Sequence, residues 1–476
     1  MTASIHQLLD EMPDRKVESV TALIGRLANE GRHSEALFCF SRMLLWSIRP
    51  NEYTFSTVIH SSLILRDLHL AQQIHCCAAK MNLVSNVYVG SAILDLYLKL
   101  SSSDHALRAF VDIKEPNVVS YTTLIRVYLK EKMFDEAKSV FESMPDRSVI
   151  SWNAMISGCC QMGKYEEALN LFFEMLKSGI IPSQSSFPCA VISAANIGAL
   201  GIGRSIHGCA VKFLGETGLF LSNSLISLYA KCGSIEESVS IFDRLKTRNV
   251  VSWNALISGY AQNGEADAAI RVYEKMKKQG VEPNSVTLLG LLSAHSHVGN
   301  VDEGYNLFDE ALRKAPELLK PEHYACVVDL LSRSGRFHEA VTFLRDHLPF
   351  DDPPGLGFWK ALLGGCRLHS NVALGKLAAS KILEPSPDDT SSYVMVSNAH
   401  SDAGRWDDVT DVRVKARERR LRKIPGCSWI EIRNDVRVFA TGDDRRRYGN
   451  CEEDVYYALL ALCFDRAMNN CGIDNV

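Results

Sequence analysis

The chain has 476 residues, of which 46% are hydrophobic and 23% are charged, the usage of a globular protein rather than a disordered or collagen-like one. Its 52 basic and 56 acidic side chains give a net charge of −4. This balance excludes a globally basic nucleic-acid binder but leaves room for a local basic face. No apolar run approaches the ~20 residues that span a bilayer, so no membrane partner is expected.

The first sixteen residues, MTASIHQLLDEMPDRK, lack both the apolar core of a signal peptide and the acid-poor composition of a transit peptide. No targeting peptide is therefore expected on this chain. The fourteen cysteines include no Cys-x-x-Cys spacing. We expect them to be reduced thiols that mostly pack as small core residues, such as Cys159 and Cys160 in one of the first helices described next.

From residue 17 onward the chain repeats itself about every 34 residues. Units start at residues 17, 52, 87, 118, 149, 184, 219, 250, 285, 321, 356 and 390. The fifteenth residue of the unit is Gly in eight of the twelve, and the twentieth is Gly, Ala or Ser in eleven. Independent globular domains would not keep such columns in phase, so a single repeat array is predicted.

Each unit has the pattern of a helical hairpin. In the unit from Val250, Trp253, Leu256, Ile257 and Tyr260 form one apolar stripe, and Asn263-Gly264 then ends the helix. A second amphipathic run follows, up to Gly280. Since one hairpin cannot bury its own stripe, neighbours must stack, which predicts an all-α solenoid, right-handed by analogy with other helical-hairpin repeats. The lengths include triplets of 35, 35 and 31 residues, which the constant tetratricopeptide period of 34 does not match.

These lengths and the motifs SWNAMISG (151–158), SWNALISGYAQNG (252–264), SLYAKCGSIEES (227–238) and HYACVVDLLSRSGR (323–336) resemble plant pentatricopeptide repeat proteins of the P-L-S class. The resemblance divides the chain into four parts. They are the tail of a truncated S-type repeat (1–16), ten repeats of P, L and S type (17–355), E1 and E2 motifs (356–423), and a partial, divergent E+ extension (424–476).

The resemblance implies an organellar factor that binds single-stranded RNA and selects cytidines for C-to-U editing, in a mitochondrion or alternatively a chloroplast. Catalytic relatives carry a C-terminal zinc deaminase with His-x-Glu and Cys-x-x-Cys. Here the chain ends without room for that domain, and His33-Ser34-Glu35 lies inside the first repeat. We therefore expect no enzyme activity, metal or cofactor. The expected partners are a deaminase-bearing editing protein supplied in trans and other accessory factors.

In this family the fifth and last residues of a unit select one base. The pairs that this implies are Thr21 with Asn51, Ser56 with Asn86, Ser91 with Asn117, Thr122 with Ser148, Asn153 with Ser183, Asn223 with Asn249, and Asn254 with Asn284. The implied target is 5′-A-n-A-R-Y-n-Y-Y-n-n, followed a few nucleotides later by the edited C. From their spacing alone, the same residues would be helix N-caps. Trp152 and Trp253 are either stacking platforms for bases or core residues, and the apolar stripe favours core.

The segment 411–423, DVRVKARERRLRK, has a net charge of +5 and is expected on the second helix of the last hairpin. Its basic residues, either phosphate contacts or a solvated helix face, are Arg413, Lys415, Arg417, Arg419, Arg420, Arg422 and Lys423. Residues 429–442 alternate like a β-hairpin with Asn434-Asp435 near its turn. That hairpin would be a docking edge for a partner or a cap on the solenoid.

Three functions are compatible with these patterns. The first is a non-catalytic specificity factor for editing, and the E-type tail favours it. The second is an RNA-binding factor for transcript stability, splicing or translation. The third is a protein-binding scaffold, in which the fifth residues would have no role in RNA binding.

Overall fold

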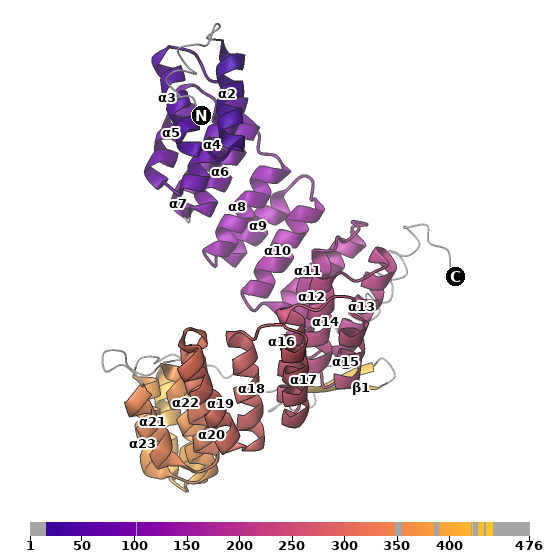
Figure 1. The fold of residues 1–476 in the computed structure, drawn as a ribbon, viewed down its shortest axis with the longest axis vertical. Helices are drawn as coiled ribbons and strands as arrows, with labels where there is room; N and C mark the ends of the chain where they lie inside the picture. Colours follow the sequence, from indigo (N-terminus) through magenta and orange to yellow (C-terminus); the bar gives the residue numbers. More distant parts are fainter. Residues whose placement is uncertain are drawn as a thin grey trace. The chain divides into compact units, whose positions relative to one another are not determined.

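The computed structural model describes residues 16–100, 102–347, 355–384, 390–419, 421, 427–432 and 435–440. These residues form pairs of antiparallel helices followed by one short β-hairpin (Figure 1). The chain divides into two compact units, one ending at Ser193 and the other beginning at Ala194, which we describe separately. None of the described helices is long and apolar enough to cross a membrane.

The first helix of each pair begins at the start of a repeat unit, in all but one case at the predicted residue. These first helices are α2 (Val17–Asn29), α4 (Glu52–Leu65), α6 (Val87–Lys99), α8 (Val118–Lys130), α10 (Val149–Gln161), α12 (Ser186–Asn196), α14 (Leu219–Lys231), α16 (Val250–Gln262), α18 (Ser285–Val298), α20 (Pro321–Arg333), α22 (Leu356–Leu368) and α24 (Thr390–Asp402).

The second helices pack against the first. They are α3 (His33–Leu45), α5 (Leu68–Lys80), α7 (Ser103–Val111), α9 (Phe134–Ser143), α11 (Tyr165–Lys177), α13 (Leu200–Leu214), α15 (Ile235–Arg244), α17 (Ala266–Lys278), α19 (Val301–Lys314), α21 (Phe337–His347), α23 (Val372–Leu383) and α25 (Trp406–Glu418). In the 31-residue units the second helix is only 9 or 10 residues long, as in α7, α9 and α15, which accounts for their shorter period.

The exception among the first helices is α12, which begins at Ser186 rather than at residue 184. Pro188 explains the shift. A helix starting at residue 184 would require the Pro188 nitrogen to donate to the carbonyl of residue 184, and proline has no N–H. Starting at Ser186 places Pro188 in the first turn, where backbone N–H groups have no intrahelical acceptor.

The turn between the two helices of a pair uses the left-handed backbone region. All eight glycines at the fifteenth position have a positive φ, between 68° and 79°. The same position is occupied by Arg66, Lys132 and Ser370 in three other units, and these residues also have a positive φ. The predicted glycine turn is confirmed, and its conformation is kept in these three units, where another residue replaces glycine.

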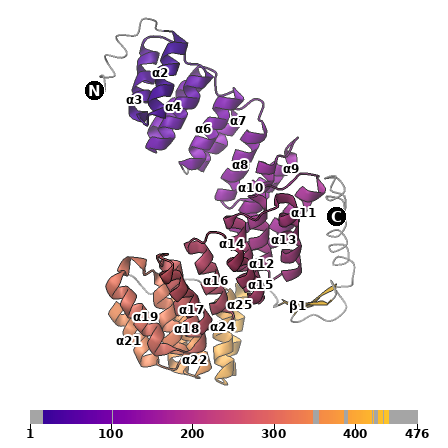
Figure 2. The same ribbon diagram turned by 45° about the vertical axis from the view of Figure 1, so that its right-hand side comes forward.

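The small residues of the twentieth column allow close approach of helices, as predicted. A Cβ atom added to Gly203 would lie 2.6 Å from the Leu228 side chain, and one added to Gly304 would lie 2.6 Å from Leu330. The apolar stripes fill the space between helices with buried residues, including Trp253 and Ile257 of α16 and Met276 of α17. In Figure 2 successive hairpins stack side by side within each compact unit, so the predicted all-α solenoid is confirmed.

The β-hairpin consists of β1 (Cys427–Ile432) and β2 (Asp435–Ala440), which pair in antiparallel register with Ile432 opposite Asp435. The predicted hairpin is present, but β1 begins two residues earlier than expected. Asp435 is the first residue of β2, and Asn434 lies outside the described residues.

Candidate nucleic-acid interface

The last residue of a unit caps the first helix of the next one. The side chains of Asn51, Asn86, Asn117, Ser148, Asn249 and Asn284 accept hydrogen bonds from backbone N–H groups in the first turn of α4, α6, α8, α10, α16 and α18. These N–H groups have no acceptor within the helix, which is why Asn and Ser stabilise it there. The capping interpretation is therefore correct for these unit-final residues, whereas each fifth-position partner lies about one turn inside the first helix of its own unit.

Three predicted pairs meet directly across the seam between neighbouring first helices. Each fifth-position amide donates from Nδ2 to the unit-final residue. The distances are 3.1 Å from Asn153 to Ser183 Oγ, 3.4 Å from Asn223 to Asn249 Oδ1, and 3.0 Å from Asn254 to Asn284 Oδ1. Two side chains about 30 residues apart in the sequence thus form one hydrogen-bonded pair.

Two further pairs are joined through a third side chain. Thr21 contacts Thr54 at 2.7 Å between hydroxyl oxygens, and Thr54 donates to Asn51 Oδ1 at 2.8 Å. Ser91 contacts Ser120 in the same way at 2.7 Å, and Ser120 donates to Asn117 Oδ1 at 3.1 Å.

The remaining two pairs are not joined. Thr122 turns back to donate to the carbonyl of Val118 at 2.6 Å. Within the described part of the chain, no hydrogen bond joins Thr122 to Ser148 or Ser56 to Asn86.

A column of exposed apolar residues, which the sequence interpretation missed, runs beside these pairs. In seven of the twelve units the second residue is apolar and between 52% and 74% exposed, namely Tyr53, Tyr88, Val119, Ile150, Phe220, Val251 and Val286. Each precedes a fifth residue by three positions, so the two side chains share one face of the helix. The available signal was an apolar residue that recurs outside the 3–4 stripe of the core.

The pair Asn254 and Asn284 lines a hollow of about 310 Å³ between α14, α16 and α18. Val251 and Val286 line the same hollow, as does Lys231 at the end of α14. Lys231 is exposed, and its Nζ donates to Asn196 Oδ1 at 3.0 Å. The hollow therefore combines two apolar walls, the two amides of the pair, the Gln262 amide and one ammonium group.

The two tryptophans belong to the core. Trp152 and Trp253 are 2% and 1% exposed, and their rings lie edge-on to Phe141 and Phe242 at 4.8 and 4.9 Å between centroids. The core interpretation is confirmed, and neither ring is available for stacking on a base. Cys159 is likewise buried, whereas Cys160 is half-buried beside the Cys189 thiol.

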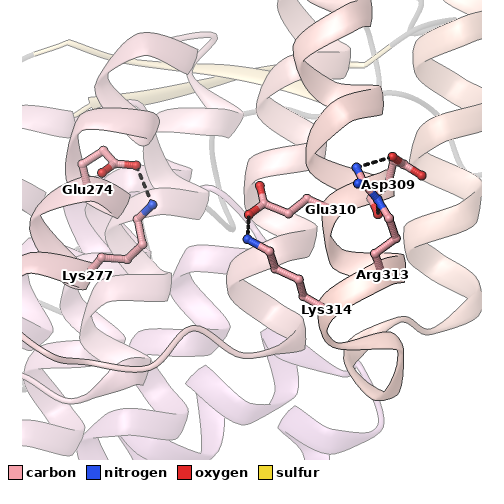
Figure 3. Close-up of polar contacts among 6 residues, drawn as sticks. All are labelled: Glu274, Lys277, Asp309, Glu310, Arg313 and Lys314. Atoms are coloured by element: carbon pink, nitrogen blue, oxygen red, sulfur yellow. Dashed lines mark hydrogen bonds and ion pairs between the residues drawn. The ribbon is translucent and has the colours of Figure 1, made fainter.

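Charged residues are unevenly distributed between the two kinds of helix. The first helices α10, α12, α16 and α18 contain no Asp, Glu, Lys or Arg. The second helices carry ion pairs instead, and Figure 3 shows three of them on α17 and α19. They are Glu274 with Lys277, Asp309 with Arg313 and Glu310 with Lys314, at 2.6–2.8 Å. Much of the acidic charge therefore lies away from the polar pairs.

The basic segment 411–423 is only partly helical, because α25 ends at Glu418. Arg413, Lys415 and Arg417 lie on the helix, and Arg419 is its exposed C-cap. Arg420, Arg422 and Lys423 lie outside the described residues. Arg413 donates to Ser397 Oγ at 3.2 Å. Basic side chains at a helix C-terminus are also favoured by the helix dipole.

The His-x-Glu of the first repeat is occupied by structural contacts. His33 Nδ1 lies 3.3 Å from Ser61 Oγ, and Glu35 forms an ion pair with Arg32 at 2.5 Å. Across the described ranges, no group of three or more His, Cys, Asp or Glu residues could hold a metal ion.

Paired helices that present a shared polar seam define a helical-repeat protein. Comparison with protein families identifies the class more closely. The family described as "PPR repeat family" matches residues 15–62, 116–150 and 248–297, and "PPR repeat" matches 150–180, 220–250 and 286–314. The family described as "E motif" matches residues 369–431. The chain belongs to the pentatricopeptide repeat family and carries its E motif.

Two relatives in Arabidopsis thaliana illustrate the similarity. The mitochondrial pentatricopeptide repeat-containing protein At5g42450 is 54% identical over 464 residues, which cover 96% of this chain and 88% of the relative. The chloroplastic protein At3g49170 is 35% identical, and the match covers 92% of this chain but only 48% of that relative.

Solved structures support the fold. The pentatricopeptide repeat protein PPR10, in complex with an 18-nt psaJ RNA element, superimposes with a TM-score of 0.67 at 18% identity. The superposition covers 87% of this chain and 62% of PPR10.

Proposed function

We propose that this protein binds single-stranded RNA sequence-specifically, and that it selects cytidines for C-to-U editing in an organelle, the mitochondrion being favoured over the chloroplast. The observation that carries the proposal is the seam itself, where joined polar pairs alternate with exposed apolar residues. Single-stranded RNA requires such a surface, because its bases are splayed, stacked and read at their edges.

The hydrogen bonds of the Asn254–Asn284 pair favour cytosine. Asn284 Oδ1 already accepts from the backbone N–H groups of Val286 and Thr287 and from Asn254. Its Nδ2, for which no described residue is an acceptor, remains a donor. Cytosine presents adjacent acceptors at N3 and O2, whereas uracil places a donor at N3. An amide donor that faces N3 therefore favours cytosine, because uracil carries an N–H there, and this agrees with the family code.

The apolar walls supply the stacking surface. A base that enters the hollow between Val251 and Val286 would bury both side chains, and its edge would face the two amides. Lys231 would meet the phosphate backbone beside the hollow. The basic residues at the end of α25 are a second place for phosphate contact.

The E motif supports the editing role. We propose that residues 356–476 recruit a deaminase-bearing protein in trans and that this chain contributes recognition without catalysis. The mitochondrial relative favours that organelle for this chain.

Sequencing of organellar transcripts from a null mutant tests the proposal. We expect one or a few cytidines to lose editing, each preceded by 5′-A-n-A-R-Y-n-Y-Y-n-n. Unchanged editing with lost or misprocessed transcripts would instead support a role in stability, splicing or translation. Purified protein that bound no RNA would favour the protein scaffold, and zinc-dependent deamination by the protein alone would refute the non-catalytic role.

A further inference from the structure

At several seams the third residue of the following first helix carries a hydroxyl that contacts the polar pair. At the seam between α16 and α18 this residue is Thr287, which is fully buried. Its Oγ1 lies 2.6 Å from Asn254 Oδ1 and 3.1 Å from the backbone nitrogen of Asn284. The hydroxyl thus contacts both members of the pair.

The Thr287 hydroxyl has two acceptors within reach, Asn254 Oδ1 at 2.6 Å and Asn284 Oδ1 at 3.2 Å, and the shorter distance favours Asn254. The Asn284 N–H donates to Thr287 Oγ1, the Thr287 hydroxyl donates to Asn254 Oδ1, and Asn254 Nδ2 donates to Asn284 Oδ1. The three residues form a closed ring of hydrogen bonds. Because the oxygen of Asn254 is held by a donor, its amide cannot turn over, and its second Nδ2 hydrogen keeps one direction.

A neighbouring seam provides a natural comparison, because Asn223 and Asn249 are the same two amino acids. There the third residue is Ser252, whose hydroxyl donates to Asn249 Oδ1 at 3.0 Å. Asn223 Oδ1 is buried and has no hydrogen-bond partner in the described part of the chain. The ring is open at this seam, so the Asn223 amide is held from one side only.

The same hydroxyl position recurs in the other compact unit. Thr54 contacts both Thr21 and Asn51, and Ser120 contacts both Ser91 and Asn117. A hydroxyl shared by both members of the pair is therefore a recurrent feature of these seams and is not limited to Thr287.

We propose that Thr287 is a positioning residue that fixes the Asn254 amide and thereby sharpens base selection by the Asn254–Asn284 pair. Selection by the Asn223–Asn249 pair is weaker because its ring is open. This inference rests on the proposed RNA binding and adds to it a residue that touches no base. It predicts that two identical Asn–Asn pairs discriminate to different extents.

The test measures affinity for ten-nucleotide RNAs of the implied pattern that differ only at the seventh or the eighth nucleotide. Wild-type protein should prefer C over U more strongly at the eighth, opposite Asn254, than at the seventh, opposite Asn223. Thr287→Val should lower the preference at the eighth nucleotide about three- to tenfold, the factor for one hydrogen bond. Thr287→Ser, which keeps the hydroxyl, should retain the preference.

Two further variants separate positioning from folding. Thr54→Val, a matched loss of a hydroxyl at another seam, should leave the C-to-U ratio at the eighth nucleotide unchanged. Thr287→Ala provides a second, smaller replacement should the valine variant fold poorly. A role limited to folding would weaken binding to every RNA equally without changing the ratio, and that result would overturn the proposal.

Failure of the positioning role and failure of the proposed RNA recognition would give different results. If Asn284→Asp, which alters a proposed base contact directly, changes the ratio whereas Thr287→Val does not, only the positioning role is wrong. If wild-type protein discriminates at neither nucleotide, the proposed reading of RNA by these seams is wrong.

Discussion

At the scale of single residues, one short stretch of helix serves both the fold and the proposed site. Asn284 caps α18 through its oxygen while its nitrogen remains available to a ligand. Trp253 fills the core, and its neighbour Asn254 contacts the next unit across the seam. Spacing alone could not separate capping from base contact, because the same side chain can do both with different atoms.

The exposed apolar column leads to a prediction at this scale. Val286→Ser should weaken RNA binding because it removes an apolar wall of the hollow, and loss of stacking on a base costs ~1–3 kcal/mol. Since every base has a flat face, the loss should be similar whichever base occupies that position. Val298→Ser, on an exposed residue at the end of the same helix, is the matched control. A change in base preference without a change in affinity would contradict a stacking role.

At the scale of helices, an arginine joins the end of a 31-residue unit to the next unit at two boundaries. Arg248 donates to the carbonyls of Phe242 and Asp243 at the end of α15 and lies 4.9 Å from the Phe242 ring centroid. Arg147 does the same at the end of α9, contacting Phe141 and Glu142. In both places the phenylalanine packs against the tryptophan of the next unit.

Arg248→Ala should therefore lower the local stability of α15 and α16 by about 1–2 kcal/mol, because it removes two hydrogen bonds from the guanidinium group and a cation–π contact. Amide hydrogen exchange across these helices is the suitable measurement, because helical repeats open locally. Lys246→Ala is the control, since its ion pair with Glu216 is highly exposed and contributes little. Equal effects of the two substitutions would contradict a stabilising role for the Arg248 contacts.

Buried and half-buried histidines make stability depend on pH. Burial lowers the pKa of His75, His207 and His295 from 6.5. Two of them contact tyrosine hydroxyls, His75 with Tyr97 at 3.1 Å and His207 with Tyr229 at 2.9 Å. Because the unfolded chain binds these protons more tightly, their contribution is complete above about pH 6.5 and is lost as the pH falls.

We therefore expect a lower melting temperature at pH 5.5 than at pH 7.5. The decrease should be smaller in the His75→Gln/His207→Gln variant, which cannot titrate at these positions. A melting temperature that is unchanged or higher at pH 5.5 in the wild-type protein would contradict the assignment.

The helices were largely predictable from sequence because glycine, proline and small residues mark their ends and contacts. The exception at α12 follows from Pro188, whose effect depends on its distance from the helix start. The polar pairs were predicted by resemblance, but the hydroxyls between them were not, because contacts between residues 29–33 positions apart depend on how neighbouring helices pack. The column of exposed apolar residues at the second position of the unit was missed because a single exposed valine is common on protein surfaces.

At the scale of the whole molecule, a net charge of −4 is compatible with RNA binding because acidic side chains gather on second helices. If the protein neutralises about three phosphates, the salt dependence should be shallow, with a slope of log K against log salt of about −2. Lys231→Ala should reduce the slope by ~0.7, the value for one phosphate contact on a single strand. Lys277→Ala, on second helix α17 and paired with Glu274, should leave it unchanged. A steep slope insensitive to Lys231 would place the phosphate contacts elsewhere.

If the seams between first helices bind RNA bases as proposed, replacing a hydrogen-bond donor by an acceptor at one seam should switch its base preference. Asn284→Asp keeps an equally good helix cap but replaces the amide donor with an acceptor. Affinity would be measured for wild-type protein and this variant against two ten-nucleotide RNAs with C or U at the eighth nucleotide. We predict that wild-type protein prefers C and that the variant shifts towards U. The same C-to-U ratio for both proteins would contradict the account.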